Sequence, residues 1–87
     1  MISKTIALNA DDFFHARPAA RIAEVSKPFV SVIMIVLGTS VADTKDSLSI
    51  MRLGHPKGAS IDLMADGPDE QAALEAVEKA IQNEFAL

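Results

Sequence analysis

The chain has 87 residues, of which 49% are hydrophobic and 5% aromatic, and its formal net charge at pH 7 is −4. A chain this short builds one hydrophobic core, so we expect a single domain over residues 1–87. The absence of cysteine excludes disulfides and thiolate metal sites, and the absence of a basic cluster argues against a nucleic-acid partner. We see neither a signal-peptide pattern nor an apolar run long enough to cross a bilayer, and we expect a cytoplasmic monomer without membrane insertion.

The first third of the sequence predicts a strand followed by a helix. Apolar side chains alternate along residues 2–8, with Lys4 as the exception, which is typical of a strand. Pro18 is tolerated in the first turn of a helix because it has no N–H to leave unpaired, and Pro28 ends that helix. The residues expected on its buried stripe are Ala19, Ile22, Ala23 and Ser26.

The middle of the chain predicts a hairpin and a short helix. Residues 30–37 are rich in β-branched side chains and favour a central strand. Residues 38–40 form a turn signal before a short return strand at residues 41–42. Residues 43–53 give a weaker helical pattern, which Gly54 closes.

The last third predicts a fourth strand and the clearest helix. Apolar residues alternate over residues 61–65 until Asp66-Gly67-Pro68 ends the strand. Asp69 and Glu70 are acidic residues in the favourable first turn of the helix that follows. Its apolar stripe consists of Leu74, Val77, Ile81 and Phe85. The order β-α-β-β-α-β-α predicts an α+β open-faced β-sandwich, with a four-stranded, mostly antiparallel sheet and three helices on one face.

His15 is the residue best placed for chemistry, because it lies between a turn and the start of a helix. A neutral imidazole is a good nucleophile near pH 7, since its ordinary pKa is about 6.5. The amides at the start of the helix and the guanidinium of Arg17 can hold phosphate oxygens. Together these groups predict a site that accepts a phosphoryl group. From spacing alone, His15 as a capping or surface residue and Arg17 as a solvated one stay open.

Other side chains give weaker signals. His55 lies in a turn and is expected to be an exposed loop residue, and Met34 and Met64 fall inside predicted strands and are expected in the core. Four aspartates lack the spacing of a calcium loop and fall on different elements, so we expect no metal site. These aspartates are Asp43, Asp46, Asp62 and Asp66.

The string His-Ala-Arg-Pro-Ala-Ala at residues 15–20 resembles the active-site motif of the HPr family, the histidine-containing phosphocarriers of the bacterial phosphoenolpyruvate-dependent phosphotransferase system. The helical stretch of residues 45–54, with its Leu-Gly pair, and the Ala-Asp-Gly-Pro-Asp-Glu string at residues 65–70 also resemble that family. The resemblance covers essentially the whole chain, in the element order predicted above.

The resemblance implies that His15 accepts a phosphoryl group on Nδ1 from enzyme I, itself charged by phosphoenolpyruvate, and donates it to a histidine of a IIA-type acceptor protein. It implies that Arg17 stabilises the phosphoryl group, with Ala16 and Asp12 beside it. Such a carrier is an intermediary rather than an enzyme and needs no cofactor. The implied partner-docking residues are Ala16, Ala20, Ser47, Leu48 and Met51.

Several positions depart from the family pattern. Phe13-Phe14 stands where a glycine and an aliphatic residue are usual, so the conformational freedom of glycine is lost before the histidine. Asp12 stands where Asn or Ser is usual, and a carboxylate about 6 Å from a phosphate costs roughly 1–5 kcal/mol. Glu24 stands on the docking helix, where the family is often basic. These departures leave open a donor from a nitrogen-related or dihydroxyacetone-kinase branch.

Asp46 stands at the family's regulatory position, where many members carry a serine that a kinase phosphorylates. An aspartate there can cap the short helix, and its charge can partly imitate phosphoserine; both interpretations stay open. Neighbouring helix residues point about 100° apart, so we expect that Ser47 does not replace the serine switch.

The sequence therefore predicts a phosphocarrier that works through His15. One alternative is an HPr-like regulatory adaptor that binds partners, with transfer impaired by the changes at residues 12–14. Another is a domain cut from a larger kinase subunit. Termini that directly flank the predicted fold argue against this second alternative.

Overall fold

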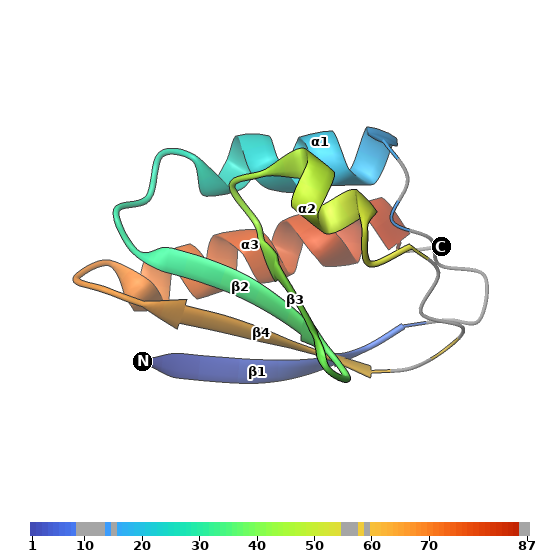
Figure 1. Cartoon of the computed structure of the whole chain (residues 1–87). Helices are drawn as coiled ribbons and strands as arrows, with labels where there is room; N and C mark the ends of the chain where they lie inside the picture. Colours follow the sequence, from blue (N-terminus) through green and yellow to red (C-terminus); the bar gives the residue numbers. More distant parts are fainter. Residues whose placement is uncertain (9–13, 15, 55–57, 59, 86–87) are drawn as a thin grey trace.

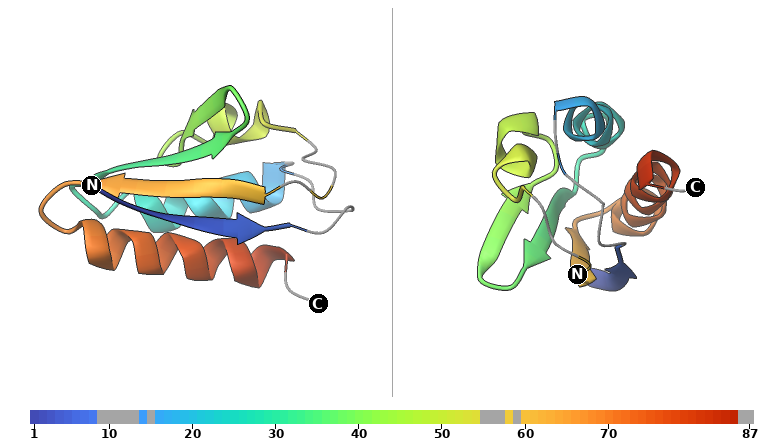
Figure 2. Two further views of the ribbon diagram at one scale, coloured as in Figure 1. Left: turned by 90° about the horizontal axis from the view of Figure 1, so that it is seen from below. Right: turned by 90° about the vertical axis from the view of Figure 1, so that its right-hand side faces the viewer.

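The computed structural model describes residues 1–8, 14, 16–54, 58 and 60–85. Three helices lie on one face of a four-stranded sheet (Figure 1; Figure 2, right). The elements in chain order are β1 (Ile2–Ala7), α1 (Ala16–Ser26), β2 (Val32–Leu37), β3 (Ser40–Asp43), α2 (Ser47–Met51), β4 (Ser60–Asp66) and α3 (Glu70–Phe85). The predicted element order and the α+β open-faced sandwich are confirmed.

The sheet has the strand order β1-β4-β2-β3, and every neighbouring pair is antiparallel. β2 is therefore an interior strand, as its run of β-branched residues predicts. Alternate residues of β2 and β4 point toward the helices and are fully buried, with Ile33 opposite Ala65 and Ile35 opposite Leu63. Burying each large aliphatic side chain contributes about 1.5–3 kcal/mol, so this inner face is a main source of stability.

The helices close the core from the other side. The predicted buried stripe of α1 is confirmed, since all four of its members are buried, and Leu74, Val77 and Ile81 of α3 are buried as predicted. α1 begins at Ala16, so Pro18 lies within its first turn. The helix ends at Ser26, whose hydroxyl donates to the Ile22 carbonyl at 2.7 Å. The buried stripe of α1 and its packing against α3 therefore fix the position of the beginning of α1.

Lys4, the exception in the alternation of β1, lies on the inner side of the sheet. It is paired in register with the buried Leu63, and its Nζ lies 2.6 Å from Glu78 Oε2 on α3. The charge reaches a partner at the edge of the helical layer instead of disrupting the core. An ion pair between elements distant in sequence therefore explains a break in the pattern.

Three expectations require correction. The helix expected over residues 43–53 is shorter, because Asp43 ends β3 and Asp46 caps α2, which covers Ser47–Met51. β2 begins at Val32 and not at residue 30, because the N–H groups of Val30 and Ser31 donate to the carboxylate of Asp69 instead of to a neighbouring strand. Met34 and Met64 are not in the core. They lie opposite each other, half-buried, on the face of the sheet that turns away from the helices.

The carboxylates before and within the first turn of α3 join that helix to the start of β2 and to the N-terminus. Asp69 accepts hydrogen bonds from the N–H groups of Val30 and Ser31, both at 2.9 Å, and from the Ser31 hydroxyl. Glu70 accepts from the Gly67 N–H and from the N-terminal ammonium. The Ser31 hydroxyl is the main cause that lowers the pKa of Asp69, and the Gly67 amide is the main cause that lowers the pKa of Glu70. We call these residues, Ser31, Gly67, Asp69 and Glu70, the β2–α3 corner.

Candidate functional site

The candidate site is the beginning of α1, where the sequence places His15. His15, Asp12 and Phe13 lie outside the described residues, as does His55. Phe14 is described, and it is 1% exposed, with its N–H donating to the Gly54 carbonyl at 2.9 Å. Because Gly54 follows α2, this bond joins the residue before His15 to the exit of the second helix. Phe14 therefore fixes the chain before α1 in two ways, by the burial of its side chain and by its backbone hydrogen bond.

Phe14 also has a role that the sequence interpretation does not include. The constraint from the missing glycine at residue 13 stays a prediction, because Phe13 lies outside the described residues. The side chain of Phe14 belongs to the hydrophobic core together with Leu8 and Ile50. The signal was present in the composition, since a chain with only four phenylalanines and no other aromatic residue has few large side chains with which to fill a core.

The first turn of α1 is suited to a negatively charged ligand. It contains no acidic residue, so the positive end of the helix dipole is not offset within this turn. Ala16 and Arg17 are exposed, whereas Pro18 and Ala19 are buried and anchor the turn on the core. Amides of a helix's first turn have no carbonyl partner one turn earlier, which makes a helix start a general anion-binding feature.

α2 supplies the second part of the site. Asp46 is its N-cap, and the carboxylate accepts a hydrogen bond from the Leu48 N–H at 3.1 Å, so the predicted capping role is confirmed. Ile50 is fully buried and fixes the helix on the core. Ser47 is half-buried and is the first residue of α2, one position beyond the cap.

The predicted docking residues come from two neighbouring helices, since α2 lies beside α1 (Figure 1). Ala16 and Ala20 are exposed on α1. On α2, Leu48 is 61% exposed and Met51 is 37% exposed. Leu48 and Met51 thus place exposed apolar area on α2, next to α1. We call Ala16, Ala20, Ser47, Leu48 and Met51 the docking surface.

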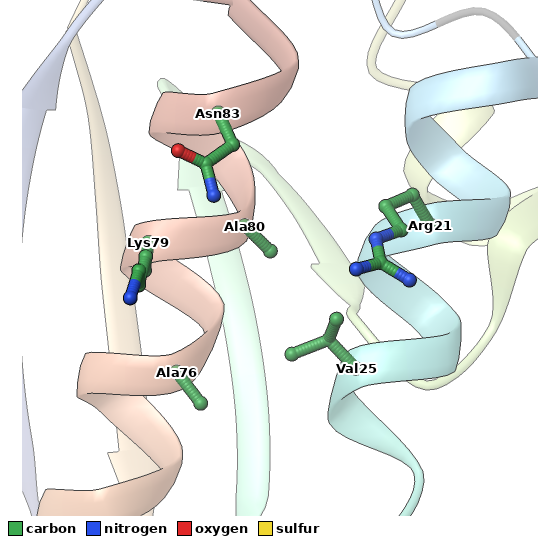
Figure 3. A pocket seen from close by; sticks show the side chains of 6 residues that line it. All are labelled: Arg21, Val25, Ala76, Lys79, Ala80 and Asn83. Atoms are coloured by element: carbon green, nitrogen blue, oxygen red, sulfur yellow. The ribbon is translucent and has the colours of Figure 1, made fainter.

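A separate groove of about 410 Å³ lies between α1 and α3. Figure 3 shows Arg21 and Val25 projecting from α1 toward α3, and Ala76 and Ala80 projecting from α3 toward α1. The remaining lining residues are Lys79 and Asn83. Arg21 also lies 3.6 Å from Glu24, so the acidic residue noted on α1 is close to a basic one. Among the described residues, none that lines the groove lies in the first turn of α1.

Two further features concern the described part of the chain. No group of three or more histidine and carboxylate side chains there is close enough to hold a metal ion; Asp43, Asp62 and Asp66 lie on strands and Asp46 caps α2. None of the helices in the same ranges is long and apolar enough to span a membrane.

Comparison with known proteins gives a consistent result. Residues 2–83 match a family model described as the phosphorylation site of the PTS HPr component. The chain is 38% identical to the phosphocarrier protein HPr of Treponema pallidum, over 98% of this chain and 97% of that protein.

Solved structures agree with this match. An HPr structure from Thermoanaerobacter tengcongensis has 31% identity and a TM-score of 0.85, covering 100% of this chain and 98% of that one. The histidine-containing phosphocarrier protein of Mycoplasma has a TM-score of 0.90 with 23% identity, covering 99% and 98%, and so supports the fold alone.

Proposed function

Because this chain belongs to the HPr family, the phosphocarrier proteins of the phosphotransferase system, we propose that His15 is its phosphoryl acceptor and that enzyme I and IIA-type proteins are its partners. The donor is an enzyme I-type protein charged by phosphoenolpyruvate, and the acceptor is a histidine of a IIA-type protein. The chain acts in the cytoplasm as a single-domain monomer and is the phosphorylated intermediary, not a free-standing enzyme. The observation that carries this proposal is the match of residues 2–83 to a phosphorylation-site model, with His15 at the position before α1.

The transfer step balances without a cofactor. The lone pair on Nδ1 of His15 attacks phosphorus, and the bond between phosphorus and the donor breaks, so that the bonding electron pair leaves with the donor. In the second transfer, a histidine nitrogen of the acceptor attacks the phosphorus, and the bond between phosphorus and Nδ1 of His15 breaks. The electron pair of that bond returns to His15. Arg17, two residues beyond His15 and exposed, offers the forked donors that suit phosphoryl oxygens. An α1 first turn without a carboxylate supports the same assignment, because it adds no repulsion to a phosphate placed there.

Docking is proposed on the same side of the molecule. Donor and acceptor contact the docking surface in turn, because each must bring its own histidine to His15. The exposed Leu48 and Met51 provide apolar contact, and the small side chains of Ala16 and Ala20 allow close approach to α1. A small, exposed apolar surface suits brief encounters, which a carrier with two successive partners requires.

The alternative of a regulatory adaptor is less well supported than transfer. Phe14, one of the residues that suggested impaired transfer, has a packing role in the core, and so its presence is no sign of a damaged site. The Glu24 carboxylate lies beside Arg21, which reduces its effect on a partner's charge.

The proposal is tested by incubating the purified chain with phosphoenolpyruvate and a panel of enzyme I proteins from the sugar, nitrogen-related and dihydroxyacetone branches. We expect acid-labile phosphate, at one group per chain, in the proteolytic peptide that contains His15. Binding to an enzyme I without any phosphate would support the adaptor instead. The panel member that charges the chain fastest identifies the branch.

A further inference from the structure

The face of the sheet that turns away from the three helices carries an apolar stripe. Figure 2 (right) shows the helices on one side of the strands, so this outer face is uncovered by helix. By register, the residues that point outward are Val32, Met34 and Val36 on β2, Val41 and Asp43 on β3, Ser60, Asp62, Met64 and Asp66 on β4, and Ser3, Thr5 and Ala7 on β1.

The large apolar side chains of this face are contiguous. Met34 lies opposite Met64 across the β2–β4 pair, and Val36 lies opposite Val41 across the β2–β3 pair. Val32 continues the line along β2. Val32 is 55% exposed and Val41 is 58% exposed, which is slightly less than the 61% of Leu48 on the docking surface. We call Val32, Met34, Val36, Val41 and Met64 the outer stripe. Five adjacent apolar side chains on a solvent-facing sheet are unusual, since such a face normally alternates to polar residues.

Carboxylates border the outer stripe. Asp43 lies opposite Met34 on β3, and Asp62 and Asp66 flank Met64 on β4. Thr5 donates a hydrogen bond to Asp62 at 2.7 Å, and the N-terminal ammonium lies 3.5 Å from Asp66. No outward position of the four strands, as described, carries a lysine or an arginine. The surroundings of the stripe are therefore acidic, with a single cation at one corner.

We infer that this outer face binds an amphipathic helix of a partner protein, with basic side chains on both flanks of the helix's apolar stripe. The apolar side chains of the partner would cover the outer stripe, and its lysines or arginines would reach Asp43 on one side and Asp62 and Asp66 on the other. The inner face of the same sheet already packs against helices, so a helix suits the geometry of the layer.

The chemistry of the face disfavours the other occupants. β2 and β4 are interior strands, and their backbone groups are used on both sides, so an added strand would find no hydrogen-bond partners there. A second copy packed through the same face would bring two sets of three carboxylates together. An anionic membrane would meet the same repulsion.

This interaction differs in place and purpose from the docking surface. The docking surface lies on α1 and α2, on the side of the sheet that the helices cover (Figure 2, right). The register places the outer stripe on the other face. A partner on the outer face therefore leaves the helical side open to a phosphoryl donor. The chain can therefore be phosphorylated and dephosphorylated while this partner is bound. Such binding suits a partner that the carrier controls, or one that holds the carrier at a particular place. The inference does not depend on phosphorylation of His15.

The experiment uses the full chain, labelled with ¹⁵N, and a synthetic peptide of about 18 residues, or roughly five helical turns, with a leucine stripe flanked by lysines. We expect amide shift changes in β2, β3 and β4 and none in α1 or α2. A matched peptide with glutamate in place of every lysine should bind at least tenfold more weakly at low salt, and this difference should shrink as salt is raised. Equal binding of both peptides, or shifts confined to the helices, would overturn the inference.

Variants then identify the contacts. Met34→Thr combined with Val41→Thr should weaken peptide binding about tenfold or more, because both side chains are lost from the apolar contact. Threonine is favourable in strands. Val41 is exposed on the edge strand β3, so the single variant Val41→Thr is expected to fold and tests the contact even if the double variant is less stable. Leu48→Thr on the docking surface is the matched control and should bind the peptide as the parent does.

The remaining occupants are tested with the same chain. Phosphatidylglycerol vesicles that shift the β2–β4 amides more than the basic peptide does would overturn the inference in favour of a membrane. Sedimentation that shows a dimer lost in Val41→Thr would overturn it in favour of a second copy. A photo-reactive residue at position 41, used in the source cells, should cross-link to a basic amphipathic helix; a captured segment of other chemistry, or no cross-link, would contradict the inference.

Discussion

The starts of α1 and α3 share the positive potential of a helix N-terminus, but only the first turn of α3 contains an acidic side chain. Both are helix N-termini, where amides point outward and the dipole is positive. At α3, Asp69 and Glu70 fill the surroundings with carboxylates, which also bind the start of β2 and the N-terminus. At α1 the first turn has no acidic residue, and the preceding Phe14 is anchored by packing and by a backbone bond to Gly54.

This difference separates stability from chemistry. The β2–α3 corner joins segments 38 residues apart and contributes to the fold. The start of α1 is held in place by buried residues on its inner side, and its first turn contains no acidic residue. Substitutions at the corner should therefore change stability, and substitutions at the start of α1 should change transfer.

The largest effect is expected from His15→Ala, which should abolish phosphoryl acceptance because no nucleophilic nitrogen remains. The anchor at Phe14 is untouched, so the free energy of unfolding should change by less than about 1 kcal/mol. Acid-labile phosphate and urea unfolding measure the two quantities. Phosphate at the parent level on the variant would disprove the assignment of His15.

Gly67→Ala should cost about 2–5 kcal/mol of stability, while each folded molecule still transfers normally. The φ of Gly67 is 153°, and an added Cβ would lie 2.5 Å from the Ser31 Oγ and 2.7 Å from the Ser31 Cα. Gly38→Ala is the matched control: its φ is also positive, at 61°, but an added Cβ meets nothing within 4 Å, so only about 1 kcal/mol is at stake. Equal losses in the two variants would show that the close approach to Ser31 does not matter.

Arg17→Lys should slow phosphoryl transfer about tenfold, because the charge is kept but the planar, forked donor is lost. Arg21→Lys, one turn later on the same helix, is the control and should leave the rate unchanged. Rapid-quench measurements with a charged enzyme I give both rates. A parent-like rate for Arg17→Lys would make Arg17 an ordinary surface residue.

Ser31→Ala should lower the free energy of unfolding at neutral pH, because it removes the buried hydroxyl that donates a hydrogen bond to the Asp69 carboxylate. The Ser31 hydroxyl holds the pKa of Asp69 below its ordinary 3.8. A carboxyl with a lowered pKa stabilises the fold above its unfolded-state value and loses that contribution as pH falls through the folded-state value. The difference in the free energy of unfolding between the parent and Ser31→Ala should therefore be largest above pH 5 and should decrease as the pH is lowered. Urea unfolding across that range checks it, and a constant difference would contradict the role of Asp69.

The N-terminus should show the opposite dependence in the parent. Glu70 raises the pKa of the Met1 ammonium above 8.0 by accepting its hydrogen bond. A group with a raised pKa stabilises the fold below its unfolded-state value, and this contribution is lost as pH rises through the folded-state value. The same series extended above pH 8 should show a small decline, which Glu70→Gln should reduce.

The smallest effect is expected from Asp46→Ser. Serine also caps helices, so the free energy of unfolding should change by less than about 0.5 kcal/mol and acceptance from enzyme I should be unchanged. Faster acceptance, with a gain that shrinks as salt is raised, would instead show that the charge of Asp46 attenuates docking.

The sequence by itself determined the element order, the buried stripe of α1, and the buried Leu74, Val77 and Ile81 of α3. The stripes of α1 and α3 and the alternation of β4 are local patterns, because a helix or strand repeats its exposure every few residues regardless of what covers it. The same local reasoning located the cap at Asp46. The docking role of Leu48 and Met51 came from the family resemblance and stays a prediction. His15 and Arg17 as phosphoryl-handling residues rest on the motif and stay predictions.

The tertiary structure decided what local patterns do not contain. Phe14 could be placed in the core only once α2 and the sheet were in position, and the shortened start of β2 depends on Asp69, which is 38 residues away from Ser31. Met34 and Met64 look like core residues along the chain, yet the helices cover only the other face of their strands. Burial and hydrogen bonding are set by which distant elements pack together, and alternation along one strand does not say which of its two faces will be covered.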